Sequence, residues 1–403
     1  MFESWKSLSL NVKQYLVVTC NYWVFTLTDG ALRMLVVLYF YQQGYQPLTI
    51  AMLFVFYEVF GVVTNLIGGW LGARIGLNNT MNIGLILQVF ALLMLAVPSD
   101  MLSVLWVMAA QALSGIAKDL NKMSAKSSIK SLVNDEPINQ QSPLFRWVAL
   151  LTGSKNALKG IGFFIGGILL SSFGFQKAML IMSTLLFVTV IFSLRFLNKE
   201  LGKAKNKPKF SEILSKDASL NYLSAARLCL FAARDVWFVI ALPVFLMVTL
   251  KWQHETVGVF LACWIIGYGF IQANTPNILK LLKNTDISGR LLSQWATLLA
   301  VVTGMIALFV YVNFAIEAVI VVGLLVFGAV FAINSSLHSY VIVSMAKEEG
   351  VSTDVGFYYM ANALGRLLGT VLSGWIFQQY GLILCLVISM LLAACSAFFI
   401  RKI

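Results

Sequence analysis

The sequence predicts an all-helical membrane protein with twelve transmembrane helices in two pseudo-symmetric halves of six. Three observations lead to this fold class. The 403 residues are 59% hydrophobic and only 11% charged, whereas soluble domains are about 45–50% apolar and about 25% charged. Apolar runs of about 20 residues, long enough to cross a bilayer, recur along the whole chain. Unusual residues also recur at a spacing of 206 or 207 residues.

The apolar runs define the predicted helices. Inside a bilayer every backbone polar group needs a partner within the structure, so each run is predicted to be a helix. In chain order the runs cover residues 15–41, 48–71, 80–97, 101–122, 146–170, 177–197, 219–249, 257–279, 291–312, 316–345, 356–379 and 382–400.

The distribution of basic side chains predicts the orientation of these helices. With the N-terminus in the cytoplasm, the inner loops and helix ends hold 21 of the 29 lysines and arginines, and six lie within the runs. The outer loops hold only Lys177 and Lys251. By the positive-inside rule both termini are cytoplasmic, and we expect a multi-pass protein of the bacterial inner (plasma) membrane. Most of the net charge of +12 is thereby explained without a nucleic-acid partner.

Cysteines and catalytic motifs give no sign of a cofactor, a metal site or an enzyme. The cysteines all fall within apolar runs and form no CxxC pair, so each is expected to be a small buried hydrophobe: Cys20, Cys229, Cys263, Cys385 and Cys395. The sequence contains neither HExxH nor GxSxG, which argues against a membrane enzyme. The longest polar loop is too short for the output domain of a membrane sensor.

An internal duplication divides the chain. Residues 198–218 form a basic, cytoplasmic linker with six lysines between predicted six-helix bundles at 1–197 and 219–403. Unusual residues of the first bundle match those of the second: Asp29 with Asp235 at a spacing of 206, and Lys159 with Arg366, Gly162 with Gly369, Gly167 with Gly374 and Gly174 with Gly381 at 207. Parallel halves of six helices describe the major facilitator fold.

The loop between the second and third runs adds a motif. The segment GGWLGARIGLNN resembles the major facilitator loop signature, roughly G-x-L-a-D-r-x-G-r-k, at Gly69, Leu71, Arg74 and Gly76. Ala73 stands where that family usually has Asp, which helps to latch one conformation, so the resemblance does not extend to that latch. A plain glycine-rich turn between helices is the alternative interpretation.

Nine ionisable side chains fall at or near the middle of the predicted helices. Asp29, Glu58, Lys159, Arg234, Asp235 and Arg366 lie near the middle of their runs, and Arg33, Lys155 and Arg227 lie one or two turns away. Each charge at the bilayer centre costs about 2.5–3.5 kcal/mol, so nine would cost roughly 25 kcal/mol facing lipid. We therefore expect them to line an aqueous cavity or to pair with one another.

The six bases among these residues predict an anionic substrate. Helical spacing places Lys155 with Lys159, four residues apart, and Arg227 with Arg234, seven apart, on shared helix faces. Arginine forks and lysines suit phosphate-like oxygens. The predicted substrate-binding residues are Arg33, Lys155, Lys159, Arg227, Arg234 and Arg366.

The acids leave two alternatives open. Asp29, Glu58 and Asp235 either couple transport to protons or form internal salt bridges. Local spacing favours the pairs Asp29–Arg33 and Arg234–Asp235. Those pairs alone would give no acidic partner to Lys155, Lys159 or Arg366.

Two further features lie outside the midplane set. Lys118 and Lys122, at the end of the fourth run, either guide anions from the cytoplasm or anchor the helix at the inner surface. His338, in the tenth run, is expected to be a hydrogen-bonded core histidine.

Five segments are distinctive enough to suggest a family: NYWVFTLTDGALRMLVV, GVVTNLIGGWLGARIGLN, QALSGIAKDLNKMSAKS, LTGSKNALKG and SAARLCLFAARDVWFVIALPVFL. Together they closely resemble the ArsJ family of organoarsenical-effluxing permeases within the major facilitator superfamily. The resemblance extends over essentially the whole chain.

The resemblance implies a substrate and a functional partner. Such permeases export 1-arseno-3-phosphoglycerate, which forms when glyceraldehyde-3-phosphate dehydrogenase uses arsenate instead of phosphate, and they confer arsenate resistance. The dehydrogenase is thus a functional partner, not necessarily a physical one, and we expect the permease to be a monomer without cofactors. An organic phosphate/inorganic phosphate antiporter of the same superfamily is the alternative.

Overall fold

The computed structural model describes residues 10–45, 50, 52–132, 143–197, 201, 203, 217–282, 287–347 and 351–403. These residues form helices and turns without any strand, which confirms the predicted all-helical class. Almost all of the predicted linker at 198–218 lies outside the described residues.

Within the described residues, each predicted run overlaps a helix or part of one. The helices are α2 (Leu10–Gln42), α4 (Val55–Ile75), α5 (Leu77–Leu95), α6 (Val104–Leu132), α7 (Pro143–Phe196), α8 (Ala218–Phe238), α9 (Ala241–Val248), α10 (His254–Leu281), α11 (Gly289–Tyr311), α12 (Ile316–Met345) and α13 (Val351–Ile400). A short 3₁₀ turn, Ser99–Met101, precedes α6. The helices α7 and α13 each contain two predicted runs, while α8 and α9 share one.

Glycines in an unusual backbone conformation join the paired runs. The two parts of α7 meet at Gly174 (φ 73°, ψ 171°), and those of α13 meet at Gly381 (φ 78°, ψ −173°). Positive φ favours glycine, because a Cβ atom would clash with the backbone. These two kinks lie 207 residues apart, at the spacing of the internal duplication.

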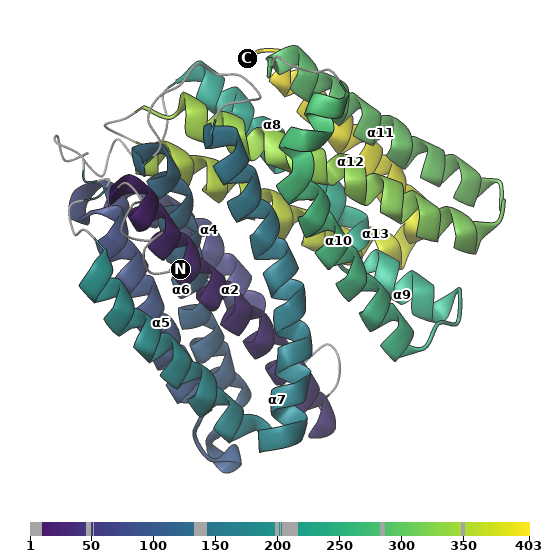
Figure 1. The fold of residues 1–403 in the computed structure, drawn as a ribbon. Coiled ribbons are helices and arrows are strands. Elements are labelled where there is room, and N and C mark those ends of the chain that lie inside the picture. The colour runs from purple at the N-terminus through teal and green to yellow at the C-terminus, as the bar shows by residue number, and fades with distance from the viewer. Residues whose placement is uncertain are drawn as a thin grey trace. The chain divides into compact units, whose positions relative to one another are not determined.

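The chain forms two compact units. The first contains Met1–Glu136, Ser154–Leu214 and Ala346–Met360, so it includes the start of α13. Within it α6 packs against α2, α4 and α5, the neighbouring purple and blue helices of Figure 1. A small residue permits this packing, because a Cβ atom at Gly115 of α6 would lie 2.5 Å from the carbonyl oxygen of Tyr57 on α4.

The second unit contains Pro137–Gly153, Ser215–Met345 and Ala361–Ile403. Here α12 packs against α8, α10 and α11. Buried aromatic rings fill the interior: Trp237 meets Phe327 edge-on at 5.1 Å between ring centroids, and Phe327 stacks on Phe331 at 5.8 Å. The predicted division at 198–218 was drawn from the internal sequence duplication, whereas these units are defined by the packing of residues. The packing does not test the division, which stays a prediction.

A close helix crossing recurs inside each unit. In the first unit α2 crosses α7, where a Cβ atom at Gly30 would lie 2.6 Å from the carbonyl oxygen of Lys159. At Gly162 it would lie 2.5 Å from that of Leu27. In the second unit α8 crosses α13, where a Cβ atom at Gly369 would lie 2.9 Å from the carbonyl oxygen of Ala232. Each crossing brings an acidic side chain of one helix close to a basic side chain of the other.

We expect Gly162→Ala to destabilise the protein and Gly167→Ala not to do so. Both variants gain the same helix propensity. Only Gly162 faces a neighbouring backbone, whereas space is open around Gly167. Overpacking of this kind costs about 1–3 kcal/mol of folding free energy. Size-exclusion profiles of heated, detergent-solubilised protein give the two apparent melting temperatures, and equal values would contradict the close crossing.

Candidate functional site

A buried ion pair joins α2 and α7 in the first unit. Asp29 is only 4% exposed, and its Oδ2 lies 3.5 Å from Nζ of Lys159. The hydroxyl of Tyr57 on α4 donates to Asp29 Oδ1 at 2.6 Å. One carboxylate therefore connects three helices.

Arg33 takes a different partner from the one that local spacing favours. Its Nη2 donates to Oε1 of Glu58 on α4 at 3.0 Å. The guanidinium also lies over the ring of Tyr57, 4.8 Å from the centroid, a cation–π distance. Arg33 thus links α2 to α4, in addition to lying one turn from Asp29 on its own helix.

The middle of α6 adds charges to this network. Asp119 is almost fully buried, lies 3.4 Å from Nζ of Lys118 and accepts a hydrogen bond from Lys122. The Lys118 ammonium also lies 3.9 Å from the ring centroid of Tyr57. Both lysines were predicted from the sequence but Asp119 was not, although its position between them, one turn before Lys122, was a usable signal.

Lys126 continues the same face of α6. Its ammonium donates to the hydroxyl of Tyr359 and lies 4.7 Å from that ring, while Lys122 lies 5.0 Å from the same centroid. Tyr359 comes from the start of α13, which belongs to the first unit. Lys118, Lys122 and Lys126 are each four residues apart, so they share one face.

The first unit thus carries a basic excess in its interior. Together with Lys155, which is half-buried one turn before Lys159 on α7, the unit has six bases and three acids among these residues. We call this set the first cluster: Arg33, Lys118, Lys122, Lys126, Lys155, Lys159, Asp29, Glu58 and Asp119. Its formal charge is +3 when every member is ionised.

The second unit repeats the acid–base pair. Asp235 on α8 is fully buried, accepts a hydrogen bond from Nε of Arg234 and lies 3.4 Å from Nε of Arg366 on α13. The Asp235–Arg366 separation nearly equals that of Asp29–Lys159. The expected Arg234–Asp235 pair is present. Lys159 and Arg366 also have acidic partners, which the pairs from local spacing alone did not supply.

Arg227 is surrounded by neutral oxygens. It is 2% exposed and donates to Asn362 Oδ1 at 2.9 Å, to the Ser335 carbonyl at 3.2 Å and to Ser339 Oγ at 3.4 Å. Its guanidinium and that of Arg234 both contact the Phe231 ring, at 4.1 and 4.9 Å from the centroid. We call Arg227, Arg234, Asp235 and Arg366 the second cluster, with a formal charge of +2.

His338 differs from its prediction. It is fully buried on α12, but neither ring nitrogen has a hydrogen-bond partner among the described residues. The prediction that His338 is a core residue is therefore confirmed, and the prediction that it is hydrogen-bonded is wrong for the described residues.

Comparisons with known proteins agree with this architecture. A family model described as Major Facilitator Superfamily matches residues 15–370. The human organic anion transporter MFSD10 (TETRAN) superposes with a TM-score of 0.75 at 15% identity, covering 98% of this chain and 100% of that one. A bacterial homologue of the iron transporter ferroportin, in its outward-facing state, gives 0.72 at 12%, covering 98% and 99%. No curated protein matches the chain. At these identities the structural likeness concerns the fold alone.

We expect Lys159→Met to destabilise the protein and Asp29→Asn to restore part of the loss. Removing one partner of a buried ion pair costs about 3–5 kcal/mol, because the remaining charge is left uncompensated, whereas removing both is far milder. The measurement is the fraction of detergent-solubilised protein that stays monodisperse after heating. A double variant as unstable as Lys159→Met alone would refute the pairing.

Proposed function

The chain belongs to the major facilitator superfamily, and from this premise we propose that it carries a small, multiply charged anion across the membrane. A member of this superfamily is a transporter rather than an enzyme. The observation that carries the proposal is the basic excess in both clusters, +3 in the first and +2 in the second. Net positive charge inside a membrane protein is costly, and an anionic cargo offsets part of that cost whenever it binds.

The kind of basic group supports an oxyanion. Arginine presents a planar fork that binds phosphate or carboxylate oxygens through two parallel hydrogen bonds. We propose that Arg33, Lys155 and Lys159 in the first cluster, and Arg227, Arg234 and Arg366 in the second, bind the cargo. Lys118 and Lys122, with Lys126 on the same helix face, then give the anion access from the cytoplasmic side.

We propose 1-arseno-3-phosphoglycerate as the cargo, exported by alternating access. The five segments that resemble organoarsenical-effluxing permeases support this choice. The molecule carries phosphate at one end and arsenate at the other, and arginine and lysine side chains suit both oxyanions. Pentavalent arsenic binds through its oxygens, so the transporter needs no cysteine site. The likeness to the organic anion transporter MFSD10 adds nothing here, because it concerns the fold alone.

The membrane potential favours export. With the protein in a bacterial plasma membrane and both termini cytoplasmic, an inside-negative potential favours anion exit by about 2.3 kcal/mol per charge per 100 mV. A cargo with about three negative charges gains about 7 kcal/mol by leaving at that potential. Proton exchange through Asp29 or Glu58 would add to the driving force for export, but export does not require it.

An organic phosphate/inorganic phosphate antiporter uses the same basic groups. Counterflow separates the two functions: an antiporter loaded with inorganic phosphate takes up external triose phosphate, whereas an exporter of the organoarsenical does not exchange these anions. Rapid counterflow would favour the antiporter.

Cells that express this chain should resist arsenate only when they also contain glyceraldehyde-3-phosphate dehydrogenase and its triose substrate. The dehydrogenase makes the proposed cargo, so without it there is nothing to export. Growth in graded arsenate, with the dehydrogenase present or depleted, measures this dependence. Unchanged resistance after depletion would exclude the proposed cargo.

Lys155→Gln and Arg366→Gln should each lower transport at least tenfold while the protein still inserts into the membrane. Each substitution removes one charge from a cluster that binds the anion. The assay is uptake of enzymatically generated 1-arseno-3-phosphoglycerate into inside-out vesicles, with and without an imposed potential. Lys177→Gln, an exposed lysine outside both clusters, is the matched control. Full transport by both cluster variants would show that the charges are structural.

A further inference from the structure

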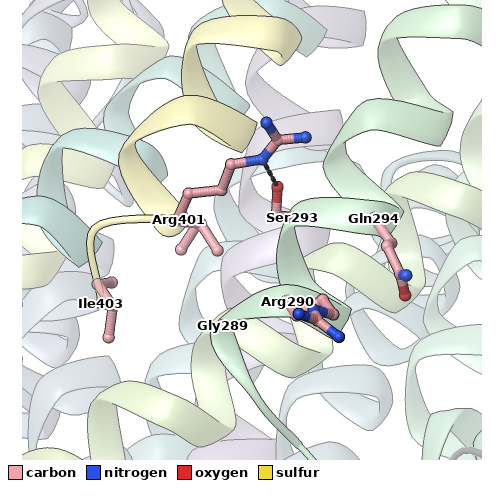
Figure 2. A pocket seen from close by; sticks show the side chains of 7 residues that line it. Gly289, Arg290, Ser293, Gln294, Arg401 and Ile403 are labelled. Carbon is pink, nitrogen blue, oxygen red and sulfur yellow. Dashed lines mark hydrogen bonds between the residues drawn. The ribbon is translucent and has the colours of Figure 1, made fainter.

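A cavity in the second unit has no part in the proposed transport. It has a volume of about 580 Å³ and lies where the first turn of α11 meets the end of α13. Its lining includes two arginines, Arg290 and Arg401, with Ser293 and Gln294 beside them (Figure 2). Ile400 and Ile403 supply an apolar wall. The cavity is large enough for a small ligand, and no acidic side chain is part of its described lining.

The helix ends around this cavity are held in place by specific contacts. Nε of Arg401 donates to Ser293 Oγ at 3.1 Å, the dashed bond in Figure 2, and Ser293 in turn donates to the carbonyl of Ala397 at 3.1 Å. A Cβ atom at Gly289 would lie 3.2 Å from the carbonyl oxygen of Ile400, so the two backbones are close. Arg401 is thus oriented through Nε, and Figure 2 shows its two terminal nitrogens directed away from Ser293.

An apolar, exposed stripe continues from the cavity along α11. Four side chains at spacings of three and four residues are between 43% and 56% exposed: Leu298, Val301, Met305 and Leu308. They follow Arg290 and Gln294 on the same helix face. The 18 helical steps from Arg290 to Leu308 rise about 27 Å, close to the thickness of the hydrocarbon core. With this helix across the hydrocarbon core, we expect the arginines at the membrane boundary and the stripe against the acyl chains.

We infer that this cavity binds the headgroup phosphate of an anionic phospholipid, with an acyl chain along the α11 stripe. Arginine forks bind phosphate oxygens well. Basic pockets between transmembrane helices on the cytoplasmic side hold anionic headgroups, and the positive-inside orientation puts this cavity there. A free phosphate shares the headgroup chemistry, but only a lipid also uses the stripe.

The first unit offers a matched control. Arg195, at the end of α7 and 206 residues before Arg401, is exposed. The first turn of α5, by contrast, carries no lysine or arginine. Because the first turn of α5 offers no counterpart of Arg290, Arg195 does not form an arginine pair there. We therefore expect replacement of Arg195 to leave lipid binding at the cavity unaffected.

Native mass spectrometry of the full chain, titrated with phosphatidylglycerol or with phosphatidylcholine of the same acyl chains, tests the inference. The intact chain should bind phosphatidylglycerol more tightly. Arg290→Gln/Arg401→Gln should weaken that binding about thirtyfold, the equivalent of about 2 kcal/mol for two charges. Arg195→Gln should leave it unchanged. Equal affinity for both lipids, or an undiminished affinity in the double variant, would overturn the inference.

Two further arms identify the source of the phosphate and guard against misfolding. Met305→Ser, on the stripe, should weaken phosphatidylglycerol binding. Soluble glycerol phosphate should fail to displace the lipid at equal concentration, and displacement would mean that the cavity takes a free phosphate instead. If the double variant does not fold, the exposed Arg290→Gln alone carries the test, with an expected loss of about fivefold.

Discussion

The structure depends on one interaction that occurs in both units: a buried carboxylate held against a base on the helix that crosses it. Asp29 meets Lys159 at 3.5 Å, and Asp235 meets Arg366 at 3.4 Å. Glycines at the crossings allow the backbones to come close enough for these contacts. Because a lone charge in this environment is costly, neither partner can change independently of the other. Around these pairs the bases outnumber the acids in both clusters, which gives each cluster a net positive formal charge.

The sequence predicted the helices well because their signal is local. Hydropathy and length alone gave the run at 316–345, which coincides with α12. The spacing of 207 residues matched Gly174 with Gly381, and the structure adds that both are kinks. The residues that make up each compact unit, by contrast, could not be predicted from the sequence. The start of α13 packs within the first unit, and no feature of composition or periodicity reports such a contact.

The candidate site was predicted only as a set of residues, not as a set of contacts. Helical spacing tells which face a side chain occupies, but not which helix lies opposite, so Asp29 was matched with Arg33 rather than with Lys159, 130 residues away. Tyr57 and Tyr359 could not be found, because an aromatic residue in an apolar run is indistinguishable from packing. Asp119 could have been found, since an acid between buried lysines has little reason to be there unless it neutralises them.

The contact between Lys126 and Tyr359 has a consequence for how the protein is made. The two residues are 233 positions apart, and a ribosome that adds about 5–20 residues per second needs roughly 10–50 s to pass from one to the other. During that time α6 is already in or near the bilayer with its row of lysines, while one of their partners does not yet exist. The first half of the chain therefore cannot reach its final arrangement as it emerges, because its completion requires the start of α13, the last helix of the chain.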